Sequence, residues 1–417
     1  MEAVIKISGL KSPFLWGQKK IGDKLRQKFV SVLRLVSQNT TETHQFRSRS
    51  KPLDVIGALS NLLTLWNDVM LNNKQHLKGD SPCARYFRDF QMNLLVVLER
   101  MKNLFSSPRC EAYFHRNSKL SINIIYIHAE LAAIFPGGVF NEQYTFAKTD
   151  AGVWWRSMFN SELHVRWPEF LQKFATEFQV TDSNMINKLH DTLSFSSEYY
   201  VSVFSMDLFS RLFAPWHLLM QVWTKLVYEH PGYMAWTTFD GMRQLLDRYK
   251  LQPGTYAFRM SCTNIGFWSV GSVSQEGAVM QTICRSQYLA DFLEEGIKKK
   301  QYLQPVGSRR NTDLGELTSN VLKYPVTARK MEDYSSRASF EICGICMNNT
   351  KNTQLEPCQH LICSSCCKKW MNRSNQCPFC RRPVCSISTI RLEFDDAETS
   401  PSPSVPDVAA ASPHPRS

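Results

Sequence analysis

Cysteine and histidine residues at regular spacing between residues 343 and 380 constrain the fold of that segment more than any other feature of the chain. Their order is Cys343-x2-Cys346-x11-Cys358-x-His360-x2-Cys363-x2-Cys366-x10-Cys377-x2-Cys380. A closely spaced pair places two donors on one side of a metal ion, and two such pairs complete a zinc tetrahedron. Four pairs therefore predict two zinc ions in closed, structural sites whose ligands all come from the protein.

The rest of the composition supports metal rather than disulfides. The chain begins MEAVIKISGLKSP, which lacks the apolar core of a signal peptide, so we expect an intracellular protein with reduced thiols. Cys367 and Cys385 lie outside the ligand pattern and receive no role. The net charge of +12 permits nucleic acid or acidic lipid as a partner, but the basic residues are scattered and form no long run.

Helical periodicity dominates the first half of the chain. Four stretches between Ile21 and Phe135 have apolar residues at helical spacing and predict a four-helix bundle over residues 1–137. The region 138–228 is rich in tryptophan and phenylalanine. It contains the non-periodic stretch SFSSEYYVS between two helical patterns, which indicates a helix, a loop and a second helix.

The second half changes to short β-prone runs. GTYAFRMSC, GFWSVGSVS and AVMQTIC are flanked by helical patterns and predict a small α+β domain over residues 229–305. We expect a linker at 306–340, the zinc domain at 341–390 and a disordered tail at 391–417. The last residues, AETSPSPSVPDVAAASPHPRS, contain no aromatic residue whose burial would offset ordering entropy.

A lone arginine, Arg259, interrupts the apolar pattern of GTYAFRMSCT. Ser261, Cys262 and Thr263 follow it in a turn. A guanidinium beside such a turn can bind phosphate through two hydrogen bonds, while hydroxyl and backbone N–H groups take the remaining oxygens. The alternative is an arginine that extends to solvent or forms an ion pair.

The zinc pattern resembles that of the RING finger. The resemblance implies an interleaved arrangement, with one zinc held by Cys343, Cys346, Cys363 and Cys366 and the other by Cys358, His360, Cys377 and Cys380. RING domains are ubiquitin ligases that dock a ubiquitin-conjugating enzyme without forming a covalent intermediate. The docking groove implied here consists of Ile345, Trp370, Pro378 and Phe379, with Arg381 as the cation between that enzyme and ubiquitin. The alternatives are ordinary packing for the four and a solvated cation for Arg381.

The segment from HPGYMAW to GFWSVGSV resembles a divergent Src-homology-2 (SH2) domain, which binds phosphotyrosine. This resemblance makes Arg259 the phosphate ligand and places Ser261, Cys262 and Thr263 beneath it. Tyr233 is expected at the border of the pocket. Gly271 is expected to stay small because backbone approaches it closely.

The order of these elements is similar to that of the Cbl ubiquitin ligases. The phrases that support the similarity are AELAAIFPGGVF, YVSVFSMDLFSRLFAPW, HPGYMAW, FRMSCTNIGFW, LEPCQHLIC and CPFCR. The resemblance implies a multidomain α+β ligase that binds tyrosine-phosphorylated receptors and negatively regulates tyrosine-kinase signalling. It also implies a cytoplasmic protein recruited to the plasma membrane. No apolar stretch approaches the ~20 residues that cross a bilayer, and no helix of the zinc segment presents a row of base-reading side chains, so we expect no membrane span and no nucleic-acid partner.

The chain departs from the Cbl pattern at the EF-hand, whose loop needs several oxygen ligands and a bidentate acid at its twelfth position. The aligned residues are Ser194, Ser196, Glu198, Tyr200, Ser202 and Ser205. With one carboxylate left, we expect no calcium at physiological levels; Glu198 is then solvated, with a weak site as the alternative. Tyr334 aligns with a regulatory tyrosine of the family if one residue is deleted before Phe340, and an unmodified surface tyrosine is the alternative.

Two other functions remain open at this point. A phosphotyrosine adaptor would bind without ligating, and would not depend on Ile345 or Trp370. A zinc-dependent nucleic-acid binder would weaken steeply with salt through counterion release.

Overall fold

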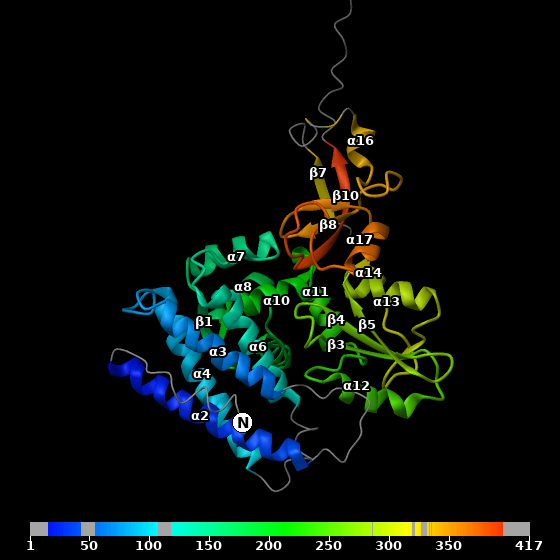
Figure 1. The fold of residues 1–417 in the computed structure, drawn as a ribbon. Helices are drawn as coiled ribbons and strands as arrows, with labels where there is room; N and C mark the ends of the chain where they lie inside the picture. Colours follow the sequence, from blue (N-terminus) through cyan, green and yellow to red (C-terminus); the bar gives the residue numbers. More distant parts are fainter. Residues whose placement is uncertain are drawn as a thin grey trace, which may run out of the picture.

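The computed structural model of the chain describes residues 16–42, 55–106, 118–285, 287–318, 322–326, 332, 334 and 336–394. Figure 1 shows a helical N-terminal part, a sheet domain beside it and a small domain above both. The expected multidomain α+β fold is confirmed. No helix in these described ranges is both long and apolar enough to cross a bilayer.

The N-terminal helices are α2 (Trp16–Glu42), α3 (Val55–Asn72), α4 (Pro82–Phe105) and α6 (Ser118–Ile134). Helix α2 packs on α3 and α4, and α3 packs on α6, so the apolar stripes meet in one core. Ser81 is the N-cap of α4: its hydroxyl accepts the Ala84 N–H at 3.1 Å.

The second helical region follows the short turn η3 (Pro136–Gly138). Its elements are α7 (Thr149–Phe159), β1 (His164–Arg166), α8 (Trp167–Phe178), α9 (Ser183–Leu193), β2 (Tyr200–Ser202), α10 (Val203–Leu212), η4 (Trp216–Leu218), α11 (Leu219–Trp223) and η5 (Thr224–Tyr228). Strands β1 and β2 pair antiparallel, which ties the loop after α9 to the entry of α8. Buried aromatic rings fill the space between these helices.

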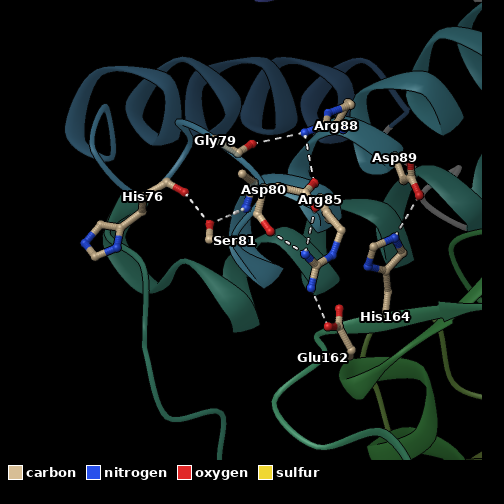
Figure 2. Close-up of polar contacts among 10 residues, drawn as sticks. His76, Gly79, Asp80, Ser81, Arg85, Arg88, Asp89, Glu162 and His164 are labelled. Carbon is tan, nitrogen blue, oxygen red and sulfur yellow. Dashed lines mark hydrogen bonds and ion pairs between the residues drawn. The ribbon is translucent and has the colours of Figure 1, made fainter.

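Polar side chains join the bundle to this second region (Figure 2). Arg85 of α4 donates to the Glu162 carboxylate just before β1, whereas Arg88 of the same helix donates to the Gly79 carbonyl in the turn before α4. One turn further along α4, Asp89 accepts a hydrogen bond from His164 Nε2 at 2.9 Å. The buried ring of His164 packs edge-on against Tyr86. The bundle and the second region therefore share one continuous interface.

The α+β domain contains α12 (Phe239–Leu246), η6 (Asp247–Tyr249), β3 (Thr255–Met260), β4 (Trp268–Val273), β5 (Val279–Cys284), α13 (Leu289–Lys298) and β6 (Gln304–Pro305). The strand order is β5-β4-β3-β6, antiparallel except for the β3–β6 pair. Alternation along β3 puts Tyr256 and Phe258 in the main core and Ala257 beneath Met242 of α12. Arg259 shares the α12 side of the sheet.

The C-terminal part is more ordered than the sequence suggested. It contains α14 (Gly315–Thr318), β7 (Leu322–Val326), α16 (Arg337–Glu341), β8 (Thr353–Glu356), β9 (His360–Ile362), α17 (Ser364–Met371) and β10 (Ser386–Phe394). Strand β7 pairs parallel with β10 in the sheet β7-β10-β8-β9. The expectation of a plain linker at 306–340 is therefore wrong at β7. The expectation of a tail from 391 is wrong for residues 391–394, because both stretches satisfy their backbone groups by pairing with each other.

The Asp89–His164 contact predicts a pH dependence. Hydrogen bonding to His164 lowers the pKa of Asp89, so the carboxylate stabilises the folded chain above its unfolded pKa of about 3.9. This contribution is lost as pH falls through the lower, folded pKa. Asp89→Asn is expected to lower the free energy of unfolding at pH 7 by about 0.2–1 kcal/mol, because solvent screens the partly exposed pair.

Urea unfolding of both proteins between pH 3 and pH 7 checks this. The difference in the free energy of unfolding between the wild type and Asp89→Asn should shrink towards pH 3. A difference that does not change with pH would contradict the prediction. Asp80→Asn is the matched control, since Asp80 is 75% exposed and its pairs with Arg85 and Arg88 should contribute little.

Candidate functional site

The structure gathers the predicted zinc ligands into two groups. One consists of Cys343, Cys346, Cys363 and Cys366, and the other of Cys358, His360, Cys377 and Cys380. Within each group the donor atoms lie within 4.8 Å of one another. This is the interleaved arrangement that the RING resemblance implies.

Local backbone geometry explains why the first group converges. Cys363 is the N-cap of α17, and its sulfur accepts the Cys366 N–H at 3.4 Å, so both thiols face the start of that helix. The positive end of the helix dipole favours thiolates there. A turn closed by Met347 N–H on the Cys343 carbonyl, at 2.9 Å, brings Cys346 to the same point.

The donor sets fit zinc. A tetrahedron with Zn–S bonds of about 2.3 Å has sulfur–sulfur edges of about 3.8 Å. The sulfurs of Cys346 and Cys363 lie 3.8 Å apart, far beyond disulfide bonding distance. In the second group, His360 Nδ1 is buried and has no hydrogen-bond partner among the described residues. A metal bond would satisfy that nitrogen.

The domain around these ligands has few other means of folding. Its core contains Leu355, Ile362, Met371, Val384 and Ile387 together with buried ligand cysteines. Cys367, to which no role was given, is buried in the same core. So small a core stabilises a domain weakly, and metal coordination must add to it.

Several apolar side chains of the RING are exposed to solvent near the two ligand groups. Ile345 is 41% exposed, Phe379 46% and Met347 77%. Pro378 is half-buried, as is Trp370, whose indole N–H donates to the Gln376 carbonyl at 2.6 Å. The Arg381 guanidinium lies 6.0 Å from the Trp370 ring. Sequence reasoning missed Met347. Its position directly after the ligand Cys346 could have indicated an apolar residue on the surface of the zinc loop.

Arg259 lies where the phosphate-pocket hypothesis needs a buried cation. It is 4% exposed, and its Nη1 donates to the Met260 carbonyl at 3.1 Å and to Cys262 Sγ at 3.4 Å. Its Nη2 donates to Gln281 Oε1 of β5 at 3.4 Å. Its Nε–H is buried without a partner among the described residues, so donor capacity remains.

The turn after β3 supplies the neighbouring polar groups. The hydroxyl of buried Ser261 accepts the Asn264 N–H at 3.0 Å, and exposed Thr263 accepts from the Asn264 side chain. Sequence reasoning missed Ser269 of β4, which lies opposite Arg259 of β3 in the strand register. Its hydroxyl is buried and has no hydrogen-bond partner in the described part of the chain. A serine at an otherwise apolar strand position was the available signal.

Tyr233 and Gly271 were both expected near this pocket. Tyr233 packs against the rings of Phe258 and Trp268, and its role at the pocket border stays a prediction. Gly271 is small for a different reason from the one expected. A Cβ there would approach Met242 Cε and Leu246 Cδ1 to 2.7 and 2.8 Å, so its close neighbours are flexible side chains of α12 and not backbone.

A buried carboxylate organises the loop that would hold calcium in an EF-hand. Glu130 of α6 is inaccessible to solvent and accepts hydrogen bonds from Ser196, from Ser202 at 2.6 Å and from Tyr200 at 3.1 Å. Tyr86 of α4 adds a fourth at 3.0 Å. Burial raises the pKa of Glu130, and these hydroxyl groups oppose that shift. Four donors match the acceptor capacity of one carboxylate, so an acid from the bundle satisfies the loop hydroxyls.

The other loop positions are also occupied by protein contacts. Ser194 donates to the His190 carbonyl at 2.6 Å, and Ser205 N–H donates to Ser202 at 3.1 Å. The expectation that Glu198 is merely solvated is wrong, because its carboxylate pairs with Arg100 at 2.9 Å. Sequence reasoning missed Glu130, whose signal was a lone acid on an apolar helix face.

Tyr334 lies against the zinc-binding domain. It is 41% exposed, its ring is 5.0 Å from that of Phe340, and the Lys351 ammonium lies 4.7 Å from its ring centroid. The same ammonium donates to the Phe340 carbonyl. The ring of Tyr334 therefore has an aromatic ring and a cation as neighbours.

Comparison with known protein families gives three matches. Residues 144–227 match the EF hand-like domain of the CBL proto-oncogene N-terminus, and residues 229–314 match its SH2-like domain. Residues 339–387 match the C3HC4-type zinc finger, the RING finger. The chain therefore carries, in this order, segments that match the EF hand-like and SH2-like domains of the CBL proto-oncogene N-terminus and a RING finger.

Relatives of known name agree with this assignment. The chain is 36% identical over 279 residues to E3 ubiquitin-protein ligase CBL-C of Rattus norvegicus, which covers 66% of this chain and 56% of the rat protein. It is 37% identical over 269 residues to the Homo sapiens protein of the same name, which covers 63% of this chain and 57% of the human protein. The chain thus spans little more than half the length of these Cbl relatives.

A solved Cbl structure shares the fold. The structure described as inactive choanoflagellate E3 ubiquitin ligase Cbl TKB has a TM-score of 0.63 and 26% identity. The match covers 72% of this chain and 92% of that one.

The ligand geometry predicts how single cysteines affect metal binding. Cys363→Ser is expected to lower the zinc bound per chain and to expose the RING core, because a hydroxyl is a poor substitute for a thiolate. Metal analysis after dialysis, together with near-ultraviolet circular dichroism, checks this. The neighbouring Cys367→Ser is the control. Equal zinc content in Cys363→Ser and the wild type would contradict the assignment.

Proposed function

We propose that this chain is a RING-type ubiquitin–protein ligase that binds tyrosine-phosphorylated proteins and promotes ubiquitin transfer to their lysines. The strongest support is that exposed apolar side chains on a RING finger and a buried arginine at a polar turn occur in one chain. A non-catalytic adaptor would have no use for such an apolar surface on its RING.

In this proposal two zinc ions hold the RING through the two ligand groups. When bound, they supply structural cross-links and no chemistry of the transfer. The S₄ and S₃N donor sets leave no position open for substrate, as in other structural zinc sites.

The exposed apolar surface of the RING would receive the ubiquitin-conjugating enzyme. Ile345 and Phe379 are exposed and Pro378 and Trp370 are half-buried, which suits contact with an apolar loop of that enzyme. Arg381 is oriented beside Trp370 and has several N–H donors for carbonyl groups of the enzyme and ubiquitin. The substrate lysine then attacks the thioester carbonyl, the carbon–sulfur bond breaks and the thiol of the conjugating enzyme leaves. The RING itself forms no covalent bond.

Substrates would be selected at Arg259. The free Nε–H of Arg259 and the hydroxyl of Ser269 are unsatisfied buried donors that a phosphate would pair with. Ser261, Cys262 and Thr263 would supply the neighbouring surface, with Tyr233 at the border. We infer that the partners are phosphorylated receptors or kinases, which would recruit a cytoplasmic ligase to the plasma membrane and reduce kinase signalling.

Tyr334 is the proposed regulatory residue. Phosphorylation would add a charge of about −1.5 to −2 to a ring that now packs on Phe340 and Lys351. The modified ring would favour another position, and the segment before the RING would move with it.

Reconstituted ubiquitination tests the ligase proposal. The full chain is incubated with activating enzyme, ATP, ubiquitin and a panel of conjugating enzymes. Ile345→Ala and Trp370→Ala are expected to reduce chain formation about 30-fold, as expected when an interface residue worth about 2 kcal/mol is truncated. Leu251→Ala is the control, because Leu251 is 97% exposed and lies outside the RING.

A separate measurement isolates the phosphotyrosine site. Arg259→Ala should abolish binding of tyrosine-phosphorylated peptides while autoubiquitination continues. Unchanged zinc content in all variants shows that the RING is folded. If the wild type forms no ubiquitin chains with any conjugating enzyme of the panel but still binds the peptides, the ligase proposal is contradicted and an adaptor is supported.

We also propose that the EF-hand-like loop keeps its structure without calcium, because its hydroxyl groups already donate hydrogen bonds to Glu130. Millimolar calcium should leave the melting temperature of the wild type unchanged. Glu130→Ala should lower the free energy of unfolding by about 2–4 kcal/mol, since it leaves four buried hydroxyl groups without their acceptor. Glu162→Ala, at a partly exposed ion pair, is the control. A rise of several degrees in the melting temperature on addition of calcium would overturn the proposal.

A further inference from the structure

Two turns at one end of the SH2-like sheet carry exposed leucines. Leu251, in the turn before β3, is 97% exposed, more than any other large apolar side chain of the described ranges. Leu303, directly before β6, is 47% exposed. Strands β3 and β6 run parallel with Thr255 opposite Gln304, so the entries of the two strands lie side by side. A lone exposed leucine needs no explanation, but two on adjoining turns do.

Hydrogen bonds hold these two turns together. The Leu303 N–H donates to the Gly254 carbonyl at 2.8 Å, and the Gln304 side chain donates to the Gln252 side chain at 3.0 Å. Gly254 has a φ of +81°, and an added Cβ there would approach Leu303 Cγ to 2.6 Å. Leu303 thus lies over Gly254, three residues from Leu251. Leu251 itself contributes little packing to this arrangement, because nearly all of its surface is exposed.

Three cations lie close to the leucines. Asn311 donates to the Leu303 carbonyl at 3.0 Å, which folds the segment after β6 back onto the segment before it. The cations are Arg309 and Arg310, which directly precede Asn311, and Lys300, three residues before Leu303. All three are exposed, and their side chains form no hydrogen bond or ion pair with any other residue that the structure describes.

The acids at the end of α13 and in η6 do not neutralise these cations, because they pair with other lysines. The pairs are Glu294 with Lys298 at 3.6 Å, Glu295 with Lys299 at 2.5 Å and Asp247 with Lys250 at 3.2 Å. Asp313 accepts the Gly315 N–H at 2.9 Å. Lys300, Arg309 and Arg310 therefore give this surface unpaired positive charge.

The leucines and the phosphotyrosine pocket lie at opposite ends of β3. Leu251 precedes the strand, whereas Arg259 is the fifth of its six residues. At about 3.3 Å per residue, Arg259 is roughly 13 Å beyond Thr255. Helix α13, which leads to Lys300, lies on the side of the molecule away from the N-terminal bundle (Figure 1). A partner bound at the leucines would leave the phosphate pocket and the bundle free.

Leucines beside unpaired cations suit the surface of an anionic membrane. Apolar side chains on exposed turns can insert among the lipid chains, while lysine and arginine stay at the headgroup phosphates. Nucleic acid or an acidic peptide would use the cations but would offer no apolar layer for Leu251. The cations also come from two segments on either side of Leu303, which suits contact with several headgroups rather than with one bound phosphate.

We propose that the strand-entry surface, defined by Leu251, Lys300, Leu303, Arg309 and Arg310, binds anionic bilayers directly. Leu251 inserts into the bilayer, and the three cations contact lipid phosphates. This interaction goes beyond the proposed function, because it requires neither phosphotyrosine nor ubiquitin. When a phosphorylated receptor is also bound, the two contacts act on one chain and prolong its stay at the membrane.

Co-sedimentation of the full chain with vesicles tests this interaction. Phosphatidylcholine vesicles with and without phosphatidylserine are compared at physiological salt, and we expect binding only to those that contain phosphatidylserine. The variant Lys300→Gln/Arg309→Gln/Arg310→Gln should bind about 100-fold more weakly, at about fivefold per cation. Leu251→Ser should bind about tenfold more weakly, because no leucine then enters the bilayer.

A second triple variant controls for net charge. Lys24 of α2, Lys78 after α3 and Arg156 of α7 are exposed cations far from the strand-entry surface in sequence. Lys24→Gln/Lys78→Gln/Arg156→Gln changes the net charge by the same amount and should bind vesicles as the wild type does. Arg259→Ala should also bind them normally. Vesicles that contain phosphatidylserine should slow hydrogen exchange in residues 250–254 and 299–311 of the wild type.

Three results would overturn the inference. The first is a wild type that does not bind vesicles containing phosphatidylserine. The second is equal weakening by the two triple variants, which indicates attraction by net charge alone. The third is vesicle binding that is unchanged in Leu251→Ser and is displaced by polyglutamate, which indicates an acidic polypeptide as the partner. None of these results concerns phosphotyrosine binding or ubiquitin transfer, so the proposed function stands or fails separately.

Discussion

A single buried carboxylate, Glu130, determines how the helical half of the chain is assembled. It accepts hydrogen bonds from α4 and from both ends of the EF-hand-like loop, so three segments distant in sequence meet at one charge. A charge without these partners would be strongly unfavourable in the interior. The bundle and the EF-hand-like domain therefore form one unit rather than two independently movable parts.

The position of the RING follows from that unit. Strand β2, whose Ser202 binds Glu130, leads directly into α10, and α10 ends near Arg211. Arg211 reaches both the RING and the turn beside Arg259. The EF-hand-like loop thus leads through α10 to a side chain that contacts both the RING and the turn beside Arg259. The hydroxyl groups of the loop donate to Glu130, and these hydrogen bonds hold the loop in place.

Regular spacing explains what could be predicted from the sequence. The zinc ligands follow a strict pattern, the helices α2, α3, α4 and α6 have apolar stripes, and β3, β4 and β5 are short runs between turns. Glu130 could not be connected to its partners, because they lie in separate segments. The RING interface was equally hidden. Arg211 and Arg285 donate to the carbonyls of Cys385 and Met371, and a backbone acceptor leaves no signature in residue type. The strand β7 was missed because its partner lies beyond the zinc ligands.

The parallel pairing of β7 with β10 has a thermodynamic consequence for the RING. These strands flank the zinc-binding segment on its two sides in sequence, so their pairing closes that segment into a tethered loop. A chain fixed at both ends has fewer conformations than one fixed at a single end, and the entropy it loses on refolding is smaller. A RING that has released its metal would therefore keep its ligand cysteines near one another, and recapture of zinc becomes a local search rather than a complete refolding.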